Sequence, residues 1–130
     1  MDKQKMVDWA VFLLRIAAGI IFVEHGGTLL FGWFGGAGVE NLPPLILAAG
    51  ILEFAGGIAV LLGLFLRPTA FLLSGLMAVA YFMAHAAKGF WYAPPANGGD
   101  PAALFAFIFL FFAAYGAGIH SIDAYLKSRK

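Results

Sequence analysis

Four long apolar stretches constrain this chain more than any other feature of its sequence. They cover residues 9–31, 45–66, 69–87 and 102–119, and each contains few or no charged side chains. The hydrocarbon core of a bilayer, about 30 Å thick, is crossed by roughly 17–25 helical residues. No stretch alternates apolar and polar residues as a membrane strand does, and backbone groups inside lipid must be paired within the segment. The stretches therefore predict membrane-spanning helices.

The composition excludes several other classes of protein. Of 130 residues, 62% are hydrophobic and only 12% are charged, against about 45–50% and about 25% in soluble domains. A net charge of +1 without a basic face argues against nucleic-acid binding, and the absence of Cys excludes disulfide scaffolds and Cys-ligated zinc. The sequence thus predicts an all-α integral membrane protein, a single domain over residues 1–130 built as an antiparallel bundle of four transmembrane helices.

The basic residues predict how this bundle is oriented. An even number of spans places both termini on one side of the membrane, and only Lys88 lies on the other side. Basic residues in short loops favour the cytoplasmic side, so both termini are expected to be cytoplasmic. The basic residues on that side are Lys3, Lys5, Arg67, Lys127, Arg129 and Lys130.

Ionisable residues inside the predicted spans gather in the outer half of the membrane. The residues three and four positions from Glu53 are all Ala or Gly, and small residues mark helix contacts, so Glu53 should point into the bundle. His25 and His85 lie at comparable depths on two other spans. Because intramembrane ionisable groups are costly, they usually face the interior. We expect a cluster of Glu53, His25 and His85, with Tyr81 and Glu24 as secondary members.

Several roles suit such a cluster. A Glu–His pair can exchange protons during quinone reduction or quinol oxidation. Two histidines and a carboxylate can also hold iron or zinc, and two histidines can bind haem, although no local spacing motif supports a metal here. The remaining role is structural, with these side chains hydrogen-bonding to each other between helices.

Aromatic residues occupy the two predicted outer loops. Trp33 and Phe34 lie in the first loop, and Phe90 and Trp91 lie in the second. Such residues often anchor a protein at the membrane interface. The other interpretation is a lid that covers an outward-facing pocket for a planar ligand.

Arg15 lies just inside the cytoplasmic end of the first span. It can extend its charge to the lipid headgroups, or it can pair with Asp123, which follows the fourth span on the same side. Because Arg15 shares a helix face with Ala18 and His25, we expect the pair with Asp123, in a structural role.

Taken together, these segments resemble the DoxX family of small four-helix membrane proteins. One departure is Leu29, which stands where the family often has Lys. The matching segments are residues 14–22, His25-Gly26, residues 31–36, residues 52–57, residues 61–65 with Arg67, His85, residues 89–91 and residues 121–123.

The resemblance implies a bacterial inner-membrane protein that works beside oxidoreductases. Family members resemble the DoxD-type subunit of thiosulfate:quinone oxidoreductase, and others are linked to complexes with superoxide dismutase in oxidative stress. The positions that the resemblance carries over are Arg15, His25, Glu53 and His85.

These observations lead to three hypotheses about function. The first is a quinone-linked redox subunit or accessory with a proton-exchange site, whose electrons come from a partner because the chain has no Cys and no cofactor motif. The second is a scaffold without enzymatic activity that recruits an oxidoreductase or a stress enzyme. The third is a small-molecule transporter, which would need a homo-oligomer because four helices form a narrow bundle.

Overall fold

The computed structural model describes residues 1–130, and all of its regular elements are helical. Three helices are long and apolar enough to cross a membrane: α1 (Lys3–Phe31), α2 (Pro44–Leu62), and α3 (Leu66–Ala80) with its continuation to Lys88. Helix α5 (Asp100–Tyr115) is also apolar but has only 16 residues. The shorter helices are α4 (Pro94–Asn97), α6 (Ile122–Ser128) and two 3-10 turns, η1 (Trp33–Gly35) and η2 (Val39–Asn41). The predicted all-helical membrane class is confirmed.

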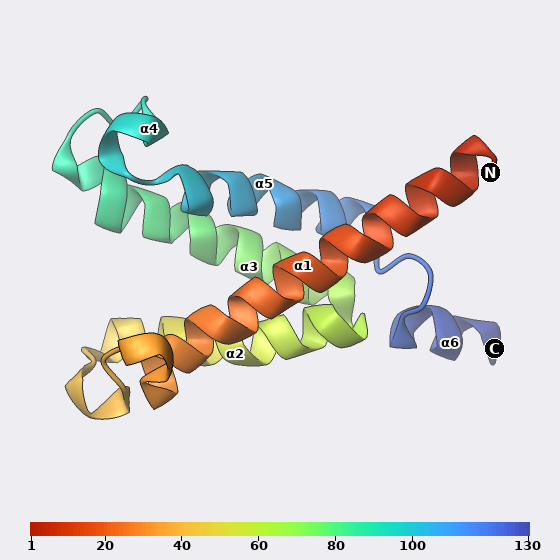
Figure 1. Cartoon of the computed structure of the whole chain (residues 1–130), viewed down its shortest axis with the longest axis horizontal. Coiled ribbons are helices and arrows are strands. Elements are labelled where there is room, and N and C mark those ends of the chain that lie inside the picture. Colours follow the sequence, from red (N-terminus) through yellow and green to blue (C-terminus); the bar gives the residue numbers. More distant parts are fainter.

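The long helices form two antiparallel pairs (Figure 1). Helix α1 packs along α2, helix α3 packs along α5, and contacts between α2 and α3 join the pairs. Both chain termini and the α2–α3 turn lie at one end of the bundle, which we call the terminal end. Segments 32–43 and 89–99 lie at the opposite end, which we call the loop end.

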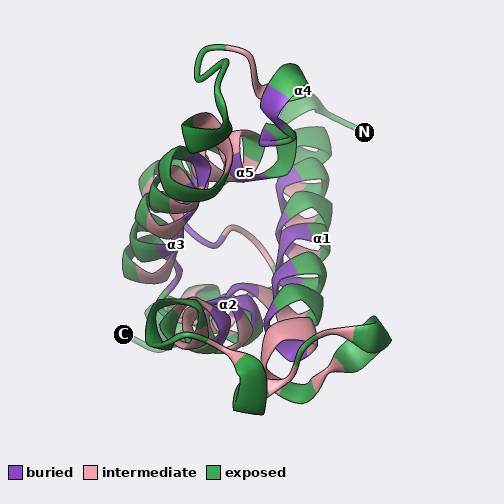
Figure 2. Cartoon of the chain, turned by 90° about the vertical axis from the view of Figure 1, so that its left-hand side faces the viewer, coloured by how far each residue is buried: buried purple, intermediate pink, exposed green.

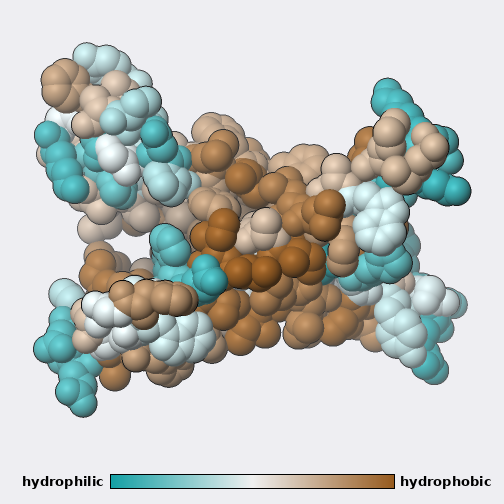
Figure 3. Space-filling model, in the orientation of Figure 1, coloured by the Kyte–Doolittle hydropathy of each residue, from teal (hydrophilic) through white to brown (hydrophobic).

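The core lies where the four long helices face a common axis, with the buried residues on their inner sides (Figure 2). Phe22 of α1 contacts two rings of α5, with centroids 5.0 Å from Phe105 and 4.7 Å from Phe109. The outer surface carries a hydrophobic belt with hydrophilic groups at both ends (Figure 3), as a bilayer requires. The core cluster consists of Val11, Ala18, Phe22, Val60, Leu66, Ala70, Leu73, Met77, Phe109, Phe112 and Ala117.

Glycines allow α1 and α2 to approach closely. Gly26 of α1 lies against Phe54 of α2, where an added Cβ would be 2.5 Å from the Phe54 backbone nitrogen. Gly57 of α2 lies equally close to the α1 backbone, and Gly19 lies against Leu61. Small residues allow such close contact between membrane helices, where van der Waals packing drives association.

Two helix ends differ from the predicted boundaries. Helix α2 ends at Leu62 because Gly63, at φ 64°, turns the chain in the left-handed region, and Arg67 is already in the first turn of α3. The chain therefore turns at residues 63–65, and not between residues 66 and 69, where the predicted second and third spans meet. Helix α5 ends at Tyr115 and does not reach residue 119, because Gly116 at φ 95° leaves the helix.

The span predicted at residues 69–87 has an irregular end. Beyond Ala80, helix α3 continues as a π-helical turn, η3 (Tyr81–His85), and a 3-10 turn, η4 (Ala86–Lys88). The π-helical turn changes the direction in which these side chains point relative to a regular helix.

We predict that Gly26→Ala lowers the thermal stability of the detergent-solubilised protein. The added methyl group overlaps the Phe54 backbone, and such overpacking costs about 1–3 kcal/mol. The matched control is Gly75→Ala on α3, where no atom lies within 4 Å of an added Cβ. The control should unfold at or above the wild-type temperature, since Ala favours helix by up to about 1 kcal/mol over Gly. Equal melting temperatures for the two variants would contradict the close α1–α2 contact.

Candidate functional site

Glu53 points toward the axis of the bundle. It is 7% exposed and shares a face of α2 with the fully buried Val60, two turns away. On either side of this face, Gly57 lies against α1 and Gly56 lies against Leu73 of α3. The carboxyl group is therefore held between α1 and α3, at the middle of α2.

The Glu53 carboxyl is incompletely hydrogen-bonded. Its Oε2 atom is buried without a hydrogen-bond partner, and so is Nδ1 of His85. These two atoms are therefore not hydrogen-bonded to each other. The expected cluster, in which Glu53 contacts His25 or His85 directly or through one water, stays a prediction. A buried polar atom without a partner is rare in folded proteins and calls for a structural or functional reason.

The two histidines of the predicted cluster have different environments. His85 is half-buried in the η3 turn, whereas His25 is exposed on the surface of α1, with its ring stacked 6.2 Å from that of Phe22. Glu24 is exposed as well. Of the predicted cluster, the structure thus buries Glu53 and partly buries His85, and leaves His25 and Glu24 outside the core.

Tyr81 is buried but is bound by the neighbouring loop. Its hydroxyl donates to the Trp91 carbonyl at 2.6 Å and accepts from Asn97 Nδ2 at 3.0 Å, and the same amide donates to the Phe90 carbonyl at 3.1 Å. This network fastens segment 89–99 onto η3. Sequence reasoning missed Asn97, although an Asn between two prolines and a pair of glycines suggests a turn with a structural side chain.

The predicted lid residues lie on two separate loops. Trp33 covers Gly27 and packs against Phe54 at 5.8 Å, whereas Phe34 is 79% exposed. Phe90 and Trp91 are exposed on the other loop. The two loops occupy different corners of the loop end in both ribbon views (Figures 1 and 2), so the structure does not bring the four rings together.

Arg15 is fully buried at the terminal end of the bundle, with 0% exposure. Its Nη1 donates to the carbonyls of Val60 at 3.2 Å and Leu61 at 3.0 Å, and its Nη2 donates to the His120 carbonyl at 2.7 Å. The last carbonyls of a helix lack partners within the helix and carry partial negative charge. The Arg15 guanidinium at the end of α2 therefore donates hydrogen bonds to carbonyl groups for which lipid offers no donor.

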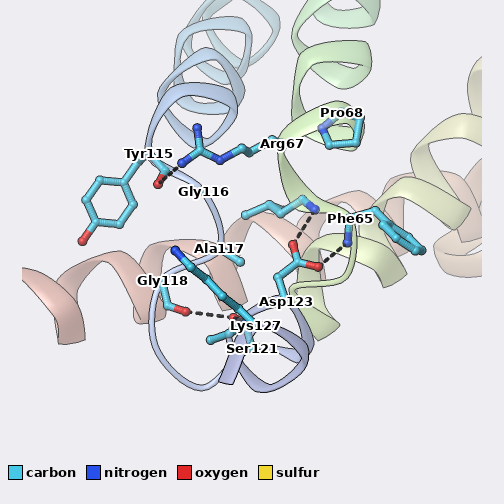
Figure 4. Close-up of a pocket in the computed structure, with 12 residues that line it drawn as sticks. Phe65, Arg67, Pro68, Tyr115, Gly116, Ala117, Gly118, Ser121, Asp123 and Lys127 are labelled. Carbon is cyan, nitrogen blue, oxygen red and sulfur yellow. Dashed lines mark hydrogen bonds between the residues drawn. The ribbon is translucent and has the colours of Figure 1, made fainter. Parts of the chain in front are cut away.

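Asp123 has the complementary role at the start of α3. Its two carboxylate oxygens accept hydrogen bonds from the backbone N–H groups of Phe65 and Leu66, both at 2.8 Å (Figure 4). The Asp123 N–H donates to the Gly63 carbonyl at 2.9 Å. The predicted ion pair between Arg15 and Asp123 is therefore wrong, because each charged group binds the backbone at a helix end instead. We call Arg15, residues 60–66 and residues 120–123 the terminal junction.

No group of three or more His, Asp or Glu side chains lies close enough together to hold a metal ion.

Apolar helices, a hydrophobic belt and a buried carboxyl near the centre of the bundle define a small multi-pass membrane protein.

The comparisons with known proteins identify its family. The DoxX family model matches residues 10–86, more than half of the chain. The chain is 41% identical over 128 residues to an uncharacterized protein of Haemophilus influenzae, covering 94% of each chain. It is 30% identical over 140 residues to the inner membrane protein YqjF of Escherichia coli, covering 97% of this chain and 98% of YqjF. No solved structure matches it.

The chain belongs to the DoxX family, as the resemblance predicted. With its apolar helices and its inner-membrane relative, it is a multi-pass protein of the bacterial inner membrane.

We predict that Asp123→Ala lowers the free energy of unfolding by about 1–2 kcal/mol, because the Phe65 and Leu66 N–H groups lose their cap. The exposed Glu40→Ala variant is the control and should unfold like the wild type. The double charge swap of Arg15→Asp with Asp123→Arg should not recover stability, because each charge then meets a helix end of the same sign. Chemical or thermal unfolding in detergent gives the free energies of unfolding of the wild type, the two single variants and the double charge swap. Recovery in the swap would contradict the backbone-capping roles.

Proposed function

We propose that this DoxX family protein spans the inner membrane four times and assists quinone-linked redox reactions by exchanging a proton at Glu53. The observation that carries the proposal is the buried Oε2 atom of Glu53, which has no hydrogen-bond partner. A hydrogen-bonding role between helices does not account for this atom. Ionisable groups that face the interior of a membrane protein commonly belong to proton or ligand pathways.

Several features support a fourth span. Helix α5 packs antiparallel along α3, is apolar throughout its middle and extends about 24 Å at 1.5 Å per residue. Bilayers accommodate a short apolar helix by local thinning at modest cost. Both termini lie at the same end of the bundle, as an even number of spans requires, and most basic residues lie there too. That end is cytoplasmic in this proposal.

Reporter fusions test this topology. A reporter that is active only in the cytoplasm should be active when fused after Lys130 and inactive when inserted within residues 35–38. A periplasmic reporter should give the reverse result at both positions. Activity of one reporter at both positions would contradict the four-span topology.

The surroundings of Glu53 suit a planar apolar ligand. The two helix pairs separate toward the loop end, and the surface is open there between the two loops (Figure 3). Helix α2 is closely packed on both sides of the carboxyl, where Gly57 lies against α1 and Gly56 against Leu73, so a ligand would approach Glu53 from the loop end. Ligand sites are concave and mostly apolar with few polar groups, and Glu53 with His85 supplies those groups here.

The chemistry of this site divides between the chain and a partner. Reduction of a quinone to a quinol takes up two electrons and two protons. Glu53 passes a proton to a carbonyl oxygen of the quinone, or accepts one from the quinol hydroxyl in the reverse reaction. His85 Nδ1 is a second group able to carry a proton toward the loop end. A partner oxidoreductase supplies or accepts the electrons, since the chain has no cysteine.

We predict that Glu53→Gln weakens binding of a short-chain quinone by about tenfold, because the amide keeps the size of the side chain but cannot exchange the proton or bear the charge. The control is Glu40→Gln, which removes an exposed carboxylate in segment 32–43. Titration of each detergent-solubilised protein, followed by tryptophan fluorescence, gives the dissociation constants.

Equal affinities of wild type and both variants would contradict a ligand site at Glu53. The scaffold hypothesis would then remain, in which the protein recruits an oxidoreductase or a superoxide dismutase-type partner without binding a quinone itself.

A further inference from the structure

A pocket lies at the terminal end of the bundle, away from Glu53. It has a volume of about 470 Å³ and opens between the ends of α3 and α5 on one side and α6 with its preceding segment on the other. Figure 4 shows Arg67 and Lys127 among the residues that line it. The proposed function uses neither of these side chains.

The cations of this pocket are not neutralised within it. The Arg67 guanidinium donates to the Ala114 carbonyl at 2.9 Å and to the Tyr115 carbonyl at 3.4 Å, which fixes its position at the end of α5. A guanidinium has five N–H groups, so three remain for another acceptor. Lys127 reaches across the pocket from α6 and makes no hydrogen bond to the other residues drawn in Figure 4.

The acidic residue in the lining balances only one of these two positive charges and makes no direct ion pair with either. Asp123 uses both carboxylate oxygens to accept the Phe65 and Leu66 N–H groups. Its charge therefore stabilises the start of α3 and is not free to bind Arg67 or Lys127.

We propose that this pocket binds the phosphate group of an anionic phosphate ester, with Arg67 and Lys127 as the two cationic ligands. Arg provides several N–H donors in one plane, and Lys provides a mobile ammonium, and this combination suits the several oxygens of a phosphate. Gly116 contributes by leaving space beside the guanidinium, because an added Cβ would lie 3.3 Å from Arg67 Nε.

The surroundings favour a phospholipid headgroup over a soluble phosphate ester. The pocket lies at the terminal end of the bundle, and the 66%-exposed Phe65 and the exposed Tyr115 are part of its lining. Tyrosine side chains such as Tyr115 settle at the level of the headgroups. Basic residues beside membrane helices attract anionic lipids.

The test compares two single-charge variants of the same C-terminal segment. Lys127→Gln removes a ligand of the pocket, whereas Lys130→Gln removes an equal charge outside it. Both residues are exposed, so thermal unfolding should match the wild type. Native mass spectrometry with added phosphatidylglycerol, phosphatidylcholine or glycerol 3-phosphate measures binding to each purified protein.

We expect the wild type to bind phosphatidylglycerol in preference to phosphatidylcholine, and Lys127→Gln to weaken that binding by about tenfold, as for a lost charge-assisted hydrogen bond. Lys130→Gln should bind like the wild type. Binding of glycerol 3-phosphate with the same dependence on Lys127 would also support the site and would make a soluble ester its ligand.

Equal effects of the two variants would overturn the proposal, because they would indicate general attraction between charges. Equal binding of the two lipids by the wild type would overturn it as well. Neither outcome bears on Glu53, whose quinone titration is independent of this pocket.

Discussion

The terminal junction depends on the hydrogen bonds that two charged side chains make to backbone groups: Arg15 binds carbonyls, and Asp123 binds N–H groups. The guanidinium binds carbonyls at the end of α2 and in segment 116–121, and the carboxylate binds N–H groups at the start of α3. Each charge thereby meets a helix end of opposite partial charge. Hydrogen bonds that involve a charged group contribute about 1.5–3 kcal/mol each. The junction connects α1, the α2–α3 turn and the chain before α6, so it holds both helix pairs together at one end.

A bundle that is joined at one end can remain open at the other. The glycine contacts keep α1 close to α2, and α3 stays with α5, while the two pairs separate toward the loop end. Glu53 lies on the inner face of α2 on the way to that opening. The fold therefore surrounds a buried carboxyl with closely packed helices, and the proposed function requires an approach to it from the loop end.

The sequence was sufficient to predict the helices and the direction of Glu53, for physical reasons. Long apolar stretches can satisfy their backbone in lipid only as helices, and the small residues around Glu53 mark the face on which α2 packs. The boundaries were harder to predict. Arg67-Pro68 resembles a turn, but Gly63 has the residue type that a left-handed helix end prefers, and the chain turns there. Gly116 similarly ends α5 within an apolar run.

The site residues were only partly predictable, because their partners are backbone atoms or depend on helix rotation. A sequence shows Arg15 and Asp123 as opposite charges but does not show the unpaired carbonyls and N–H groups that they bind. Spacing placed His25 on the same face of α1 as Arg15 and Ala18, yet the contact of Gly26 with α2 turns the histidine outward. The central claim concerns the proton on Glu53, and redox-induced infrared difference spectroscopy with a bound quinone tests it most directly. The account predicts a carboxyl band that changes on reduction, persists in Glu40→Gln and disappears in Glu53→Gln. A spectrum that is the same in Glu53→Gln as in the wild type would contradict it.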